Sequence, residues 1–203
     1  MFNLVLKDIL IQKKLIPFYL ATIILYLLID ASLVKIGIIY SLVSIMNAFS
    51  YDEKDNANIL LNSLPYTRKE VVNSKYIGAL IFTSIFIIFT YVSNFLLNRE
   101  EAMFLWQDIL LIIGLVMVGV SFMFPFSYKF KSQYLLMALI ALFGIYMLTI
   151  KIFPNFNNIL GDLISKFITL QETQMYLVAI LTIVILYIGS WLLSIRIYER
   201  KAF

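Results

Sequence analysis

The sequence contains four long runs without a single Asp, Glu, Lys or Arg, and these runs constrain the fold more than any other feature. They are Tyr76 to Asn98, Ile109 to Tyr128, Ser132 to Ile150 and Thr173 to Ile195. A helix needs about 20 predominantly apolar residues to cross the hydrocarbon layer of a bilayer. Each run therefore predicts one transmembrane helix.

A further apolar region, Leu15 to Ser50, is interrupted by Asp30 and Lys35. One straight helix of this length would exceed the hydrocarbon thickness by about 20 Å. We therefore expect two short spans joined near Asp30 to Lys35, which gives six spans in an all-α polytopic membrane protein. A shallow re-entrant hairpin is the alternative, and it leaves the topology unchanged because it returns to the same side.

The composition agrees with a membrane protein and excludes most site chemistry. Of 203 residues, 62% are hydrophobic and 14% are charged, whereas soluble domains are about 45–50% apolar and about 25% charged. Cys and His are both absent, which excludes disulfides, imidazole bases and Cys/His zinc sites. The charge-free runs also lack the two facing aspartates of an intramembrane aspartyl protease. We expect no catalytic, metal or cofactor site in this chain.

The distribution of basic residues predicts the topology. With six spans, both termini and the second and fourth loops share one side, and that side holds 12 of the 16 Lys and Arg residues; the other four are Lys35, Arg99, Lys151 and Lys166. Lys and Arg are enriched in cytoplasmic loops, so both termini are expected in the cytoplasm. The acidic residues divide equally between the two sides, which argues against a nucleic-acid partner.

Residues 1–14 predict an amphipathic helix in the membrane interface. Its apolar face carries Phe2, Val5, Leu6 and Ile9, and its polar face carries Asn3, Lys7 and Lys14. A cleaved signal peptide with Leu15 to Ile29 as its apolar region is the alternative.

The segment from Tyr51 to Tyr76 carries eight charges and two possible helix starts. Ser50 with Glu53, and Thr67 with Glu70, have the spacing of a capping box. Pro65 disfavours a helix at the residue before it. We therefore expect a short cytoplasmic helix from about Asp52 to Ser63, a bend at 64–66 and a new helix from Thr67.

The short helix would present an apolar edge made of Ala57, Leu60, Leu61 and Leu64. Such an edge fits either a partner surface or packing beneath the protein's own bundle. We interpret Asp52, Glu53 and Asp55 as solvated charges at a helix start rather than as a metal site.

Several short motifs in this segment resemble the cytoplasmic signature of ABC-2 type transporter permeases. They are Tyr51-Asp52-Glu53-Lys54, Leu61-Asn62-Ser63-Leu64-Pro65, Arg68-Lys69-Glu70-Val71-Val72 and Ser74-Lys75-Tyr76. The chain is most similar to the small permeases that serve peptide export in Gram-positive bacteria, such as the membrane subunits of the phenol-soluble modulin exporter. The resemblance implies a permease in the bacterial cytoplasmic membrane that works as a homodimer or heterodimer and exports amphipathic or hydrophobic peptides, including toxins.

The resemblance also implies a partner and a contact surface. The loop would form a coupling helix in a groove of a separate ATPase subunit, with the N-terminal helix on the ATPase flank. Its contact residues would be Asp52, Glu53, Lys54, Asn56, Leu60, Leu61, Leu64, Pro65, Arg68, Lys69 and Glu70. ATP and Mg would belong to that subunit, since this sequence has no G-x-x-x-x-G-K-[ST] loop. A non-transporting membrane immunity or binding protein is the alternative function.

We expect a single ABC-2 type transmembrane domain over residues 1–203. It would comprise a connecting helix (1–14), spans 1 and 2 (15–50), the coupling loop (51–75), spans 3 to 6 (76–195) and a basic cytoplasmic tail (196–203). The amphipathic stretch from Lys151 to Glu172 fits an interfacial or half-membrane helix. It is shorter than the region that precedes the last span in larger members of the superfamily.

Overall fold

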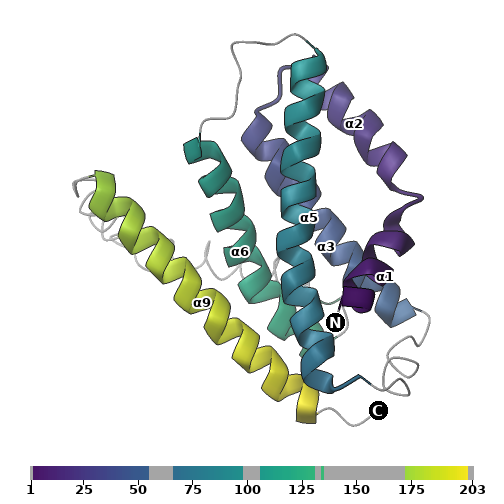
Figure 1. The fold of residues 1–203 in the computed structure, drawn as a ribbon, viewed down its shortest axis with the longest axis vertical. Coiled ribbons are helices and arrows are strands. Elements are labelled where there is room, and N and C mark those ends of the chain that lie inside the picture. The colour runs from purple at the N-terminus through teal and green to yellow at the C-terminus, as the bar shows by residue number, and fades with distance from the viewer. Residues whose placement is uncertain (1, 55–65, 98–105, 131–133, 135–171, 201–203) are drawn as a thin grey trace, which may run out of the picture.

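The computed structural model describes residues 2–54, 66–97, 106–130, 134 and 172–200, which contain α-helices and no strand (Figure 1). The helices are α1 (Phe2–Gln12), α2 (Ile16–Leu28), α3 (Leu33–Lys54), α5 (Arg68–Leu96), α6 (Trp106–Lys129) and α9 (Glu172–Arg200). The predicted all-α fold is confirmed for these residues. The predicted span at 132–150, the stretch 151–172 and the short helix beyond Lys54 fall almost entirely outside the described residues.

Four of these helices, α3, α5, α6 and α9, are long and apolar enough to cross a membrane. The number rises to five if α1 and α2, which bend by 65° at their junction, form one span. Three of the charge-free runs lie in α5, α6 and α9, as predicted. The chain is therefore a multi-pass membrane protein, with four to five candidate spans among its described residues.

The predicted break near Asp30 is confirmed, since α2 ends at Leu28 and α3 begins at Leu33, but α2 has only 13 residues and counts as a candidate span only together with α1. The geometry at Asp30 explains the break. Asp30 has a positive φ of 60°, a conformation that Asp tolerates better than most residues. The amide of Asp30 donates to the carbonyl of Leu27, and that of Ala31 donates to the carbonyl of Tyr26. These two bonds form a Schellman motif, which satisfies the last carbonyls of α2 and turns the chain toward α3.

The predicted helix start at Asp52 is wrong, because α3 continues without interruption to Lys54. Ser50 and Glu53 both lie inside this helix. Residues three apart are neighbours on any helix surface, so their spacing alone does not indicate a helix start. The second predicted start is confirmed. The side chain of Thr67 accepts from the amide of Glu70 at 3.2 Å, and the carboxylate of Glu70 accepts from the amide of Thr67 at 2.8 Å.

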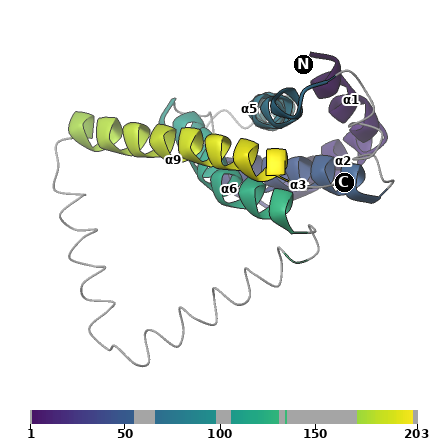
Figure 2. The same cartoon turned by 90° about the horizontal axis from the view of Figure 1, so that it is seen from below.

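The helices are arranged with α9 on one side of the bundle and α1 and α2 on the other (Figures 1 and 2).

Two glycines allow α3 and α6 to cross closely. A Cβ at Gly37 of α3 would lie 3.0 Å from Ile112, and a Cβ at Gly119 of α6 would lie 3.0 Å from Leu42. Small residues at helix crossings are typical of membrane proteins, in which close van der Waals packing drives helix association.

Candidate functional site

The candidate site is the end of the bundle at which α3 ends and α5 begins, here called the loop end. Residues 55–65, followed by Tyr66 and the cap residue Thr67, connect these two helices. α1 lies beside this end through an ion pair between Lys7 and Asp52. α9 also terminates there, because Arg68 donates to carbonyls of its last turn.

Four charged side chains from three helices form a closed group at the loop end, here called the charge ring. It consists of Lys7 and Asp8 of α1, Asp52 of α3 and Lys75 of α5. Lys75 Nζ lies 2.8 Å from Asp8 Oδ2 and 2.5 Å from Asp52 Oδ2. Lys7 Nζ lies 2.6 Å from Asp52 Oδ1 and 3.1 Å from Asp8 Oδ1. Each cation therefore contacts both anions.

Most of the charge ring is removed from solvent. Asp8 is 2% exposed, and Asp52 and Lys75 are each 6% exposed. Buried charges are tolerated when they are paired and hydrogen-bonded. Lys75 Nζ also donates to the carbonyl of Ala48 at 3.1 Å. This arrangement corrects our interpretation of Asp52, which is a buried, ion-paired residue and not a solvated charge.

α1 packs one face against the rest of the bundle. Its buried residues are Leu4, Val5, Asp8 and Gln12, whereas Phe2 and Leu6 are exposed. α1 is a helix as predicted, but it turns a partly polar face toward the bundle because Asp8 and Gln12 find partners there. Gln12 Nε2 donates to the carbonyl of Ser44 at 3.0 Å.

Arg68, Lys69 and Glu70, three of the predicted contact residues, all have partners within this chain. Arg68 Nη1 donates to the carbonyls of Tyr198 and Glu199 at 3.2 and 2.7 Å. A cation at this position complements the negative end of a helix and satisfies free carbonyls. Lys69 is mostly exposed and forms a long ion pair of 3.9 Å with Glu199, while Glu70 caps α5.

The other predicted contact residues divide between described and undescribed parts of the chain. Glu53 and Lys54 lie in the last turn of α3. Five of them, Asn56, Leu60, Leu61, Leu64 and Pro65, lie outside the described residues.

Sequence reasoning missed the roles of Lys7, Asp8 and Lys75. One available signal was the spacing of Leu4, Asp8 and Gln12, which places them on one face of a helix. No group of acidic residues in the described part of the chain could hold a metal ion.

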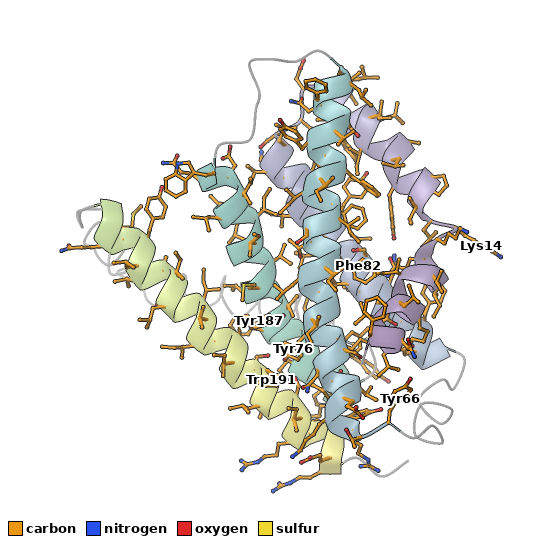
Figure 3. All side chains as sticks on the ribbon, viewed as in Figure 1. Lys14, Tyr66, Tyr76, Phe82, Tyr187 and Trp191 are labelled. Atoms are coloured by element: carbon orange, nitrogen blue, oxygen red, sulfur yellow. The ribbon has the colours of Figure 1, made fainter. Side chains whose placement is uncertain are left out.

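A second polar junction joins α5 to α9 and α6 (Figure 3). The hydroxyl of Tyr76 lies 2.7 Å from Ser190 Oγ and 2.8 Å from Ser194 Oγ. Ser190 donates its only hydroxyl proton to the carbonyl of Ser121 at 2.7 Å. Tyr76 must therefore donate to Ser190 and accept from Ser194, since each hydroxyl has one proton. The result is a directed chain of hydrogen bonds across three helices.

Two further bonds strengthen the contact between α5 and α9. Tyr187 donates to the carbonyl of Tyr76 at 2.8 Å, and Trp191 Nε1 donates to Asn73 Oδ1 at 2.6 Å. Tyr76, Tyr187 and Trp191 gather where α5 and α9 approach each other, whereas Lys14 points away from the bundle (Figure 3). Toward the other end of the bundle, α9 diverges from α5 (Figures 1 and 2). Its contact with α6 there includes Trp106 and Tyr176, whose ring centroids lie 5.5 Å apart.

We expect the substitution Tyr76→Phe to lower the free energy of unfolding by about 1–2 kcal/mol, because it removes the central hydroxyl of the chain. Unfolding by sodium dodecyl sulfate in mixed micelles would measure the loss. Tyr26→Phe is the matched control, since Tyr26 is exposed on α2 and its loss should stay within about 0.5 kcal/mol. Equal losses for the two variants would contradict the assigned hydrogen-bond chain.

Comparison with known protein families gives a match to the ABC-2 family transporter proteins over residues 3–199. The match covers almost the whole chain, so the protein belongs to this family. It is a membrane permease subunit of an ABC-2 type transporter, which is non-catalytic. Permeases of this family pair with ATPase subunits. Comparisons with curated proteins and with solved structures give no match.

Proposed function

We propose that the chain is the permease subunit of an ATP-driven exporter and that its loop end contacts the ATPase subunit. The observation that carries this proposal is that several helices of this ABC-2 family protein meet at the loop end. The ends of α3, α5 and α9 converge there, together with α1. A contact on residues 55–65 would therefore act on four helices at once.

The proposal assigns the loop end to the cytoplasm. Lys7, Lys54, Arg68, Lys69, Lys75, Arg196 and Arg200 belong to helix segments near this end. Such a concentration of basic residues is typical of the cytoplasmic side of a membrane protein. Both termini are then cytoplasmic, and ATP and Mg bind to the partner subunit. Asn56, Leu60, Leu61, Leu64 and Pro65, with the exposed Lys69, would make the contact itself.

The decisive experiment is purification of the tagged chain from native membranes and identification of the copurified subunits. We expect an ABC ATPase and a second permease, which is either another copy of this chain or a related chain. Recovery of a stable partner without an ATPase domain would overturn the proposal and favour a non-transporting immunity or binding protein.

We expect Leu60→Asp or Leu64→Asp to reduce recovery of the ATPase at least tenfold, because each places a charge in an apolar contact. Lys69→Glu tests whether the exposed cation of Lys69 also contributes to binding of the ATPase. Arg68 is unsuitable for this test, since its substitution would also remove the cap of α9. Ile29→Asn is the control and should leave recovery unchanged, because Ile29 is exposed in the turn between α2 and α3, at the opposite end of α3 from the loop. Full recovery with both loop variants would exclude residues 60–64 from the contact.

We further propose that the cargo is an amphipathic or hydrophobic peptide. The three charge-free runs in α5, α6 and α9 support an apolar route, because relays for ions or protons usually place ionisable residues within the membrane. ATP hydrolysis by the reconstituted complex should rise with an amphipathic helical peptide and not with a hydrophilic oligosaccharide. A response to the sugar alone would contradict the assignment.

A further inference from the structure

We propose that the charge ring is a positioning device that holds α1 and both stems of the loop 55–65 as one rigid body. The stems are the last turn of α3, which carries Asp52, and the first turns of α5, which carry Lys75. The proposal rests on the function proposed above, because it explains how a displacement of that loop would reach the membrane-embedded helices.

The connectivity of the charge ring favours a rigid unit over separate ion pairs. Lys75 bridges Asp8 of α1 and Asp52 of α3, and Lys7 bridges the same two carboxylates. Separating any one helix from the other two therefore breaks at least two ion pairs. Because three of the four side chains are buried, no water would replace the lost contacts without further opening of the structure, and separation is costly.

A second contact fixes the angle between α1 and α3. Lys7 pairs with Asp52 at the loop end. Gln12, later in α1, donates to the carbonyl of Ser44, earlier in α3. Two contacts spaced along a pair of antiparallel helices resist rotation as well as separation. The bond from Lys75 to the carbonyl of Ala48 ties α5 to the same part of α3.

The attachment of α9 is of a different kind. Its contacts with α5 at Tyr76 and Asn73 are bonds between neutral groups, each of which costs less to break than a buried ion pair. Lys75 and Tyr76 are adjacent in the chain, so the charged and the neutral junctions meet at one point of α5. The charged contacts of α9 with α5, from Arg68 to the carbonyls of Tyr198 and Glu199 and from Lys69 to Glu199, include no buried ion pair. Displacement of the loop would thus move α1, α3 and α5 together, with α9 joined to them without a buried ion pair.

Pulsed electron spin resonance between α1 and α5 tests this inference. The sequence has no cysteine, so Leu10→Cys and Ile77→Cys introduce the only two labelling sites, and both positions are exposed. The labelled permease would be reconstituted in nanodiscs with its ATPase, without nucleotide and with ATP plus orthovanadate. We expect one narrow distance distribution that is the same in both states. A shift between the two states larger than the width of the distribution would overturn the inference.

Variants of the charge ring separate its role from general stability. Lys75→Gln should at least double the width of the distribution, and Lys75→Arg should restore it because a cation again bridges the two carboxylates. Should Lys75→Gln fail to fold, Asp8→Asn serves instead, since it removes the carboxylate of α1 that pairs with Lys75 of α5 and leaves the pair of Lys7 with Asp52. A distribution for folded Asp8→Asn as narrow as that of the parent would overturn the inference.

The same variants can be compared in nanodiscs without any partner. Failure of the proposed function would appear as absence of an ATPase from the complex. Failure of the present inference would appear as unchanged widths in the permease alone. The two failures are therefore distinguishable.

Discussion

The substitution Lys75→Met is expected to lower the free energy of unfolding by about 3–5 kcal/mol. Lys75 contacts both Asp8 and Asp52, and all three side chains are buried. Its removal leaves two carboxylates with Lys7 alone, so one buried negative charge loses its compensation. Unfolding by sodium dodecyl sulfate in mixed micelles, followed by circular dichroism, would measure the change.

Two comparisons isolate the charge from the shape of the side chain. Lys69→Met, on the same helix at an exposed position, should change stability by less than about 0.5 kcal/mol. The double variant Lys75→Met with Asp8→Asn should recover much of the loss, because it removes one charge of each sign and retains the pair of Lys7 with Asp52. A double variant less stable than Lys75→Met alone would show that shape, and not charge, dominates.

The substitution Phe124→Ala is expected to cost about 3–5 kcal/mol through the cavity that it leaves. Phe124 is 1% exposed and lies on α6 with ring centroids 4.8 Å from both Phe49 of α3 and Tyr76 of α5. The ring therefore fills the space in which three helices meet, beside the hydrogen-bonded Tyr76. Thermal denaturation in detergent would report the loss as a lower Tm.

Phe122 provides an internal control for this prediction, because it lies two residues away on the same helix and is 69% exposed. Phe122→Ala removes the same atoms from a site that faces outward, so the change should be within about 0.5 kcal/mol. A comparable loss for both variants would mean that Phe122 is covered in the folded protein.

The length of the charge-free runs was sufficient to predict α5, α6 and α9, while the run at 132–150 lies almost entirely outside the described residues. A charge-free run long enough to cross the bilayer as a helix has few alternatives to that structure. In the hydrocarbon layer, every backbone polar group must find its hydrogen-bond partner within the segment. The break near Asp30 was predictable for a related reason, since a single helix would have been too long. The capping box of Thr67 and Glu70 was predictable because it is a local arrangement.

Predictions failed where partners distant in sequence decide the outcome. The same spacing at Ser50 and Glu53 predicted a helix start that does not exist, because the preceding apolar helix continues through both residues, whereas Pro65 precedes the true start at Thr67. Asp52 was interpreted as solvated because its partners, Lys7 and Lys75, lie 45 and 23 residues away along the chain. The burial of Asp8 on α1 was not predictable for the same reason, since Asp8 is stabilised there by Lys75, 67 residues away.

The partners of α5 also imply an order of assembly during synthesis. Lys75 can pair with Asp8 and Asp52 as soon as α5 has been made. Tyr76 must wait for Ser190 and Ser194, which are 114 and 118 residues away, and Arg68 must wait for the last turn of α9, 130 residues away. Until α9 enters the membrane, the start of α5 retains a hydroxyl and a guanidinium without these partners. Insertion of the last helix is therefore the event that completes this end of the bundle.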